Sequence, residues 1–175
     1  MKKIVIIILS CTLFATCTEK TTSEKYFNSG VEKYYNLRDE KGAISDYTNA
    51  IKLNPKYADA YFERGNVKYI LKDYKGAISD FTKVIEIGPK FAVFYFSRGL
   101  AKAGLKDYRG AIIDYTKAIE IDPKYAEVYY NRGKVKSDLV GGIEEGCLDY
   151  LKAFELGYKT LISESVIKFC DLIKN

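Results

Sequence analysis

Residues 58–91 read ADAYFERGNVKYILKDYKGAISDFTKVIEIGPKF, and much of this stretch returns 34 residues further along the chain. The only three prolines of the sequence follow the same spacing, at Pro55, Pro89 and Pro123. Other residue types share it, namely Tyr61, Tyr95 and Tyr129, Arg64, Arg98 and Arg132, Gly65, Gly99 and Gly133, Lys68, Lys102 and Lys136, and Asp46, Asp80 and Asp114. One period shared by so many residue types predicts a protein built from repeated units.

Each unit has the pattern of two helices joined by a short turn. In residues 58–91, the first helix is expected over 58–71 and the second over 74–87, where apolar residues recur at helical spacing. Gly88 and Pro89 end the second helix, since proline inside a helix would cost about 3 kcal/mol. The small residues Gly65 and Ala77 are expected where the paired helices approach closely.

This unit resembles the tetratricopeptide repeat. The family signature has an aromatic residue, a Leu-Gly pair and a Tyr in its first helix, then Ala and an aromatic residue in its second, then Pro. The matching residues are Tyr61, Gly65, Ala77, Phe81 and Pro89. Arginine replaces the usual Leu in three units, and Lys68, Lys102 and Lys136 stand where Tyr is frequent. Because these departures recur, they indicate a variant of the repeat.

The resemblance implies an all-α fold, an α-solenoid of about four helix-turn-helix repeats with a C-terminal capping helix. The expected domains are a signal peptide over 1–16, a polar tether over 17–25, four repeats over 26–159 and the cap over 160–175. The cap is expected to turn one apolar face inward, made of Ile162, Val166, Phe169, Cys170 and Ile173. The end units are irregular, because Gly30 comes one residue early and one residue is inserted near 140–142.

The recurring arginines are expected to pair with the recurring aspartates, because an arginine at the packed position of a leucine needs a charged partner. The expected pairs are Arg64 with Asp80, Arg98 with Asp114, and Arg132 with Asp149. The aspartate of the preceding unit is the alternative partner. The first unit lacks the arginine, so this scheme leaves Asp46 without a partner.

In the family, the first helices line a concave groove that receives an extended peptide or a partner helix. The resemblance therefore implies groove residues at three levels of the helices. They are Asn28, Phe62, Phe96 and Tyr130, then Glu32, Asn66, Leu100 and Lys134, and at the far rim Tyr35, Tyr69, Ala103 and Ser137. The aromatic stripe would offer an apolar contact with polar edges. Since an aromatic residue is common at this repeat position, the stripe indicates a surface without identifying a ligand.

The N-terminus has the features of an export signal. Lys2 and Lys3 precede a short apolar run, which is typical of a secretory signal peptide. The residues up to Cys17 resemble the bacterial lipobox, so lipidation at Cys17 is expected, with ordinary secretion as the alternative. In an exported protein, Cys147 and Cys170 could form a disulfide that fastens the cap, or remain two buried thiols.

Composition argues against catalysis. Histidine is absent, which excludes Ser-His-Asp and Cys-His chemistry and His-ligated zinc. The net charge of +5 is spread over alternating acids and bases, which disfavours nucleic acid as a partner. We therefore expect no catalytic residue, cofactor or metal, and a lipid-anchored interaction module or assembly scaffold of the cell envelope with a protein partner. The alternative is an accessory subunit that uses its repeat edges or convex face.

Overall fold

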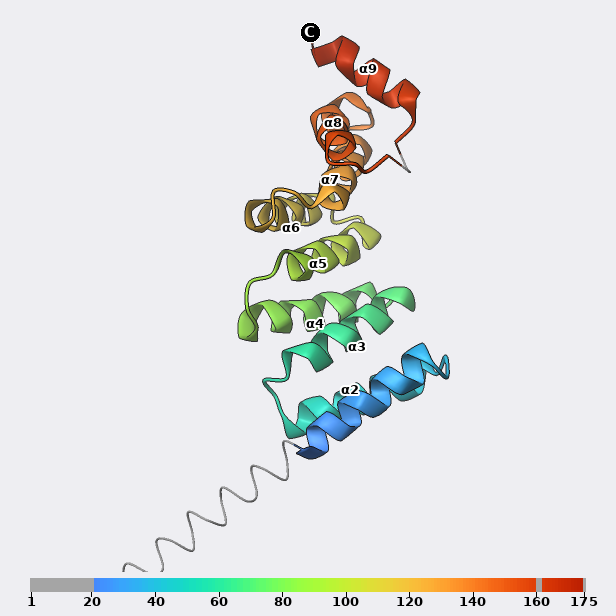
Figure 1. Ribbon diagram of the computed structural model, residues 1–175, viewed down its shortest axis with the longest axis vertical. Coiled ribbons are helices and arrows are strands. Elements are labelled where there is room, and N and C mark those ends of the chain that lie inside the picture. Colours follow the sequence, from blue (N-terminus) through green and yellow to red (C-terminus); the bar gives the residue numbers. More distant parts are fainter. Residues whose placement is uncertain (1–20, 160–161, 175) are drawn as a thin grey trace, which may run out of the picture.

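The protein is an elongated stack of helices (Figure 1). The computed structural model describes residues 21–159 and 162–174, and no β-strand occurs among them. A first helix includes residues 21–35. The later elements are α2 (Glu40–Leu53), α3 (Ala58–Ile70), α4 (Tyr74–Ile87), α5 (Ala92–Gly104), α6 (Tyr108–Ile121), α7 (Ala126–Val140), the 3₁₀ turn η1 (Glu144–Gly146), α8 (Cys147–Glu155) and α9 (Glu164–Lys174). Consecutive pairs, from the first helix with α2 to α7 with α8, form units one to four.

The second helices of the first three units begin in the same way. Asp39, Asp73 and Asp107 each precede the helix, and their side chains accept the backbone N–H of the glycine three residues later. An N-terminal cap of this kind satisfies one of the free backbone donors of the first turn. The expected helix-turn-helix units are thus present; in unit two the second helix has the expected bounds, and the first ends at Ile70, one residue earlier than expected.

Glycines in the first helices allow the paired helix to pack closely. A Cβ atom on Gly65 would lie 2.7 Å from the Phe81 ring, and one on Gly99 would lie 2.6 Å from the Tyr115 ring. Such distances are too short for carbon atoms, so a side chain at either glycine would push the helices apart. The expected close approach occurs, and the opposing groups are the aromatic rings of the second helices.

Arginine–aspartate pairs connect the two helices of units two to four, as expected. Arg98 donates from Nε and Nη2 to the two carboxylate oxygens of Asp114, at 2.9 and 2.7 Å. Lys102 lies 2.7 Å from the same carboxylate, which is 2% exposed. The equivalent groups are Arg64, Lys68 and Asp80, and Arg132, Lys136 and Asp149. Each buried carboxylate therefore has two cationic partners.

Each of these arginines also binds the preceding unit, but through a threonine and not through the aspartate considered as an alternative. Nη1 of Arg64 donates to Oγ1 of Thr48 at 3.0 Å. Arg98 and Arg132 make the same contact with Thr82 and Thr116. The hydroxyl accepts a hydrogen bond without adding a second buried charge, so the network links successive units.

The prediction that Asp46 lacks a partner is wrong. Its carboxylate accepts a hydrogen bond from Oγ of Ser29 at 2.6 Å and lies 2.7 Å from Nζ of Lys33. Because Gly30 is one residue early, Ser29 stands at the arginine position of unit one and Lys33 at the lysine position. The lysine neutralises the carboxylate where the arginine is missing.

Residues 21–25, expected to belong to a polar tether, are helical. Ser23 is fully buried, so the first helix is already packed at this residue. The expected signal peptide and Cys17 lie outside the described residues. Among those described, no helix is both long enough and apolar enough to cross a bilayer.

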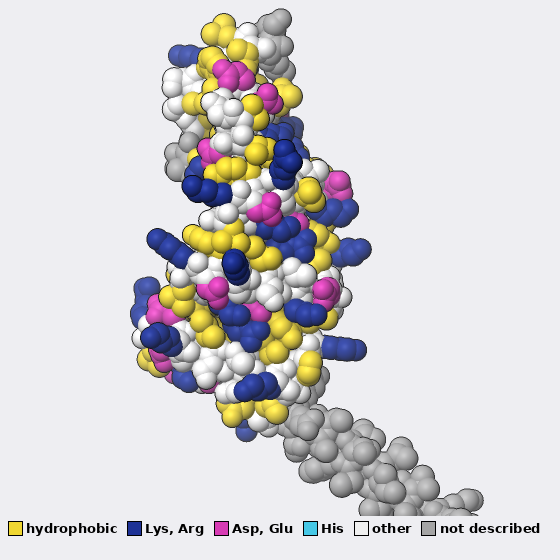
Figure 2. Space-filling model, turned by 180° about the vertical axis from the view of Figure 1, so that it is seen from behind, with side chains coloured by type: hydrophobic (Ala, Val, Ile, Leu, Met, Phe, Trp, Pro, Cys, Tyr) yellow, Lys and Arg dark blue, Asp and Glu magenta, His cyan; other side chains and the backbone are white. Residues whose placement is uncertain are grey.

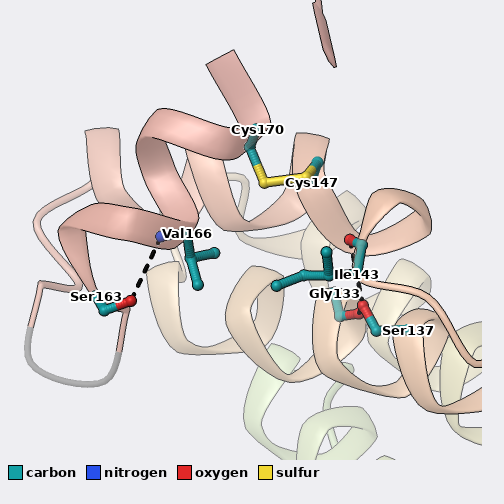
Figure 3. Close-up of a disulfide and its surroundings, with 7 residues drawn as sticks. All are labelled: Gly133, Ser137, Ile143, Cys147, Ser163, Val166 and Cys170. Atoms are coloured by element: carbon teal, nitrogen blue, oxygen red, sulfur yellow. Dashed lines mark hydrogen bonds between the residues drawn. A yellow bond between two sulfur atoms is a disulfide. The ribbon is translucent and has the colours of Figure 1, made fainter. Parts of the chain in front are cut away.

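The C-terminal end is held by a disulfide between Cys147 of α8 and Cys170 of α9 (Figure 3). Oγ of Ser163 accepts the N–H of Val166 at the start of α9. Ile162 and Cys170 are buried, as expected for the cap, whereas Phe169 and Ile173 are 37% and 46% exposed. The inward apolar face of the cap is therefore narrower than predicted.

The inserted residue near 140–142 is accommodated by Gly141, which has a φ of 80°.

Candidate functional site

The first helices line one side of the curved stack. Helix α3 lies against α5, and α5 lies against α7, whereas the second helices in the described chain make no comparable contacts with one another. Elements on the inner side of a curved array are closer together than those on its outer side. The concave face is therefore formed by the first helices, and the second helices form the convex face.

The predicted aromatic stripe packs between helices. The Phe96 ring lies 5.9 Å from that of Tyr115 and 5.1 Å from that of Tyr125, and Phe96 is 5% exposed. Phe62 and Tyr130 contact rings in the same manner but stay half-buried. Phe96 is thus not the exposed contact residue that the resemblance implied, because the next unit covers its ring.

Asn28 does not share the position of Phe62 and Phe96, because the register of unit one is shifted. Phe27 occupies it, with its ring 5.8 Å from that of Tyr47 and 5.1 Å from that of Tyr57. Asn28 itself is exposed, as are Glu32 and Tyr35. The early Gly30 was the signal for this shift, but the groove positions of unit one were assigned with the unshifted spacing of 34.

A pocket of about 250 Å³ opens on the concave face between α3, α5 and α7. Its wall includes four predicted groove residues, Tyr69, Leu100, Ala103 and Lys134, together with Asn131 and Asp138. The pocket lies over Ala103 and Gly104, where unit two has the larger Tyr69 and Ile70. A side chain at Gly104 is excluded because its Cβ would lie 2.8 Å from the Tyr74 ring. The pocket is therefore a consequence of small residues in α5.

The wall of this pocket contains a buried tyrosine whose hydroxyl has no hydrogen-bond partner among the described residues. Tyr115 is fully buried, and its burial raises the pKa of the phenol. In unit four, the polar Ser137 lines the same pocket as the equivalent Tyr150. In unit three, Ala103 stands at the position of Ser137 and offers no polar side chain. The Tyr115 hydroxyl is therefore left unpaired within the described chain, and an unpaired buried hydroxyl lowers the free energy of unfolding.

Acidic residues on the concave helices were missed by the sequence reasoning. Asp59 and Glu63 share one face of α3, and Glu127 and Asp138 share one face of α7 with Lys134. Each of these acids lies one residue or one helical turn from a predicted groove position. This spacing in the sequence could have identified them as groove residues. The exposed arc of such a helix is wide enough to include these positions.

Glu63 is half-buried, whereas Asp59 and Asp138 are exposed. The Glu63 carboxylate accepts a hydrogen bond from the Tyr35 hydroxyl at 3.4 Å. Burial raises the pKa of Glu63, and the nearby charge of Asp59 raises it further. No lysine or arginine in the described ranges forms a salt bridge with it within 4.0 Å. The carboxylate is therefore held in the groove without a compensating cation.

Among the described residues, no group of three or more Cys, Asp or Glu side chains is arranged to hold a metal ion. Lysine and arginine side chains project along the length of the face shown in Figure 2, with acidic and hydrophobic side chains between them. This distribution agrees with the alternating charges of the sequence.

Comparisons with known proteins point to one family and fold. The family model described as TPR repeat matches residues 32–70 and 104–139, and the one described as Tetratricopeptide repeat matches residues 58–91. Together the matches cover more than half of the chain. The comparison with curated proteins finds no match.

Solved structures with similar folds include a crystal structure of MamA protein, with a TM-score of 0.77 and 23% identity, covering 87% of this chain and 82% of that one. MamA from Desulfovibrio magneticus RS-1 has a TM-score of 0.72 and 24% identity, with 80% and 78% covered. The Arabidopsis OM64 TPR domain has a TM-score of 0.64 and 27% identity, with 69% and 98% covered. These similarities show a shared α-solenoid fold.

Proposed function

Because the chain belongs to the tetratricopeptide repeat family, we propose that it binds a segment of a partner protein in the groove formed by its first helices. Proteins with this repeat are generally non-enzymatic modules for protein–protein interaction, and this chain is an interaction scaffold of that kind. The finer proposal concerns which surface is used. The groove is favoured over the convex face and the repeat edges.

The observation that carries the proposal is the pocket between α3, α5 and α7. It collects side chains from three successive units, so a ligand in it would contact the array as a whole. The apolar wall at Leu100 and the polar rim at Asn131 and Lys134 have the usual composition of a binding site, in which apolar surface supplies affinity and a few polar groups supply orientation.

The groove can be tested with two matched substitutions in unit three. Leu100→Arg places a charged side chain in the pocket, and Ile113→Arg places the same side chain on α6, where Ile113 is 68% exposed. Both variants and the wild type are crosslinked in cells and their partners are captured, after circular dichroism has shown equal helix content. Loss of a partner with Leu100→Arg alone supports the groove. Loss with Ile113→Arg alone refutes it and favours the convex face, the alternative surface.

We further propose that the chain acts in the cell envelope, anchored by a lipid on Cys17. The basic and apolar N-terminal residues support this proposal, as does the disulfide between Cys147 and Cys170, since disulfides persist in oxidising compartments. Metabolic labelling with a palmitate analogue tests it. Wild type should be labelled and Cys17→Ala should not, and an unlabelled wild type would refute the anchor.

A further inference from the structure

We propose that the concave groove binds an extended partner segment that carries lysine or arginine side chains. The inference rests on the groove function proposed above and adds the chemical class of the ligand. It follows from a difference between the charge of the groove and the charge of the rest of the molecule.

The groove is acidic in a chain whose net charge is +5. On the concave faces of α3, α5 and α7 stand four acids, Asp59, Glu63, Glu127 and Asp138, and one base, Lys134. The corresponding face of α5 is uncharged, with Val93, Ser97, Leu100 and Gly104. The acids thus form two groups, one on α3 and one on α7, separated by an apolar floor. A segment with two cationic side chains and an apolar middle would be complementary to this arrangement.

Three acids on the convex face are paired with lysines, unlike the four acids of the groove. Glu86, Glu120 and Glu155 each lie 2.7 to 3.1 Å from the Nζ of a lysine three residues earlier. The four acids of the groove form no such pair with a base in the described ranges. A partner cation in the groove would therefore meet carboxylates that form no salt bridge with a lysine or arginine of the described residues.

At α3, the site for a cation is centred on Glu63. The carboxylate accepts a hydrogen bond from the Tyr35 hydroxyl, and Asp59 lies one turn away on the same helix. Burial is the main reason for the raised pKa of Glu63, and repulsion from the like charge of Asp59 adds to it. A lysine or arginine between them would remove this repulsion, so part of the cost of burying the acid is recovered on binding.

At α7, the site combines a charge with a cavity. Asp138 forms part of the pocket rim, and fully buried Tyr115 forms part of its wall with a hydroxyl that has no partner in the described chain. The phenol stays neutral at physiological pH because burial raises its pKa, so its oxygen can accept a hydrogen bond. An ammonium or guanidinium group entering the pocket could thus be met by both a carboxylate and a neutral acceptor.

The test uses labelled peptides with the full chain. The groove spans four first helices, and three steps of about 9 Å require about eight residues of extended peptide. The probes are two fluorescent peptides of this length that alternate Ala and Tyr with either Lys or Glu. Fluorescence anisotropy measures their binding at low and high salt, since attraction between exposed charges is screened by salt.

Two triple variants distinguish binding by the groove acids from attraction due to the overall charge of the protein. The groove variant carries Glu63→Gln, Glu127→Gln and Asp138→Asn. The control variant carries Glu86→Gln, Glu120→Gln and Glu155→Gln, which changes the net charge equally on the convex face. All six substitutions nearly preserve side-chain shape, and circular dichroism checks the fold of both proteins.

The lysine peptide should bind the wild type, bind more weakly as salt rises, and lose about tenfold in affinity with the groove variant but less than twofold with the control. Equal losses in both variants, tighter binding of the glutamate peptide, or binding of neither peptide would overturn the inference. The groove function itself would still stand if Leu100→Arg released the cellular partner. It would fail together with the inference if that variant released nothing.

Discussion

Removing Asp114 should damage the array far more than removing its arginine partner. Asp114 is the single anion facing Arg98 and Lys102, and its carboxylate is 2% exposed. The side chains of Arg98 and Lys102 are 18% and 20% exposed. Asp114→Asn would leave two mostly buried cations without an anion. Arg98→Leu would leave a complete pair, because Lys102 stays 2.7 Å from the carboxylate.

The magnitudes follow from this asymmetry. Breaking a buried ion pair by removing one partner costs about 3 kcal/mol, since the other charge is left uncompensated. Arg98→Leu does not leave a buried charge alone, because Asp114 keeps Lys102 as its cation, so this variant should cost only about 1 kcal/mol. For a protein of this size, the melting temperature should fall by about 6–12 °C for Asp114→Asn and by about 2–4 °C for Arg98→Leu.

Urea unfolding followed by circular dichroism would measure both variants under the same conditions. A Thr82→Val variant serves as a control, because it removes only the hydrogen bond that Arg98 makes to the preceding unit. Equal losses for Asp114→Asn and Arg98→Leu, or a larger loss for Arg98→Leu, would refute the reasoning. Such a result would mean that the arginine, and not the aspartate, holds the network together.

Three further predictions concern other parts of the chain. Tyr115→Phe should raise the free energy of unfolding by about 1 kcal/mol in urea, because it removes a buried unpaired hydroxyl and the equivalent Phe81 already fits in unit two. Glu63→Gln should stabilise the protein at pH 7, because the pKa of Glu63 is raised in the folded state and its ionised form therefore opposes folding. The gain should shrink as the pH falls through the folded pKa towards the ordinary value of 4.5, which urea unfolding at several pH values measures. Replacing Cys147 and Cys170 by serine should cost about 3 kcal/mol and speed hydrogen exchange in α9, since the bond closes a loop with a sequence separation of 23 residues.

Each of these has an outcome that contradicts it. A less stable Tyr115→Phe would mean that the hydroxyl has a partner in solution. A gain from Glu63→Gln that is the same at pH 7 and at pH 4.5 would exclude a charge effect. Unchanged exchange in α9 without the disulfide would show that packing alone holds the cap.

The repeat architecture was predictable because periodicity is a property of the chain itself. Pro89, Gly65 and Phe81 each act on backbone or neighbours within one unit, so their spacing predicted the helices, the turns and the close packing of the pair. The pairing of Arg98 with Asp114 was predictable for the same reason, since both lie in unit three. The error at Asp46 arose where the period itself shifts by one residue.

The groove was less predictable, because exposure there depends on the neighbouring unit. Phe96 and Phe62 occupy the same repeat position, yet the ring of Phe96 is nearly fully buried and that of Phe62 is not. The pocket exists because Ala103 and Gly104 lie beside the larger Tyr69 of the preceding unit. The spacing of residues within one repeat does not reveal that side chains at equivalent positions of two units differ in size.

The sequence by itself thus determined the helices, their pairing and the buried ion pairs, because these depend on contacts within a unit of 34 residues. Only the tertiary structure decided which aromatic rings are covered, where the pocket opens and which acids remain unpaired. The physical reason is that these properties arise where three units meet, so they depend on the curvature of the stack and on the volumes of side chains far apart in the chain.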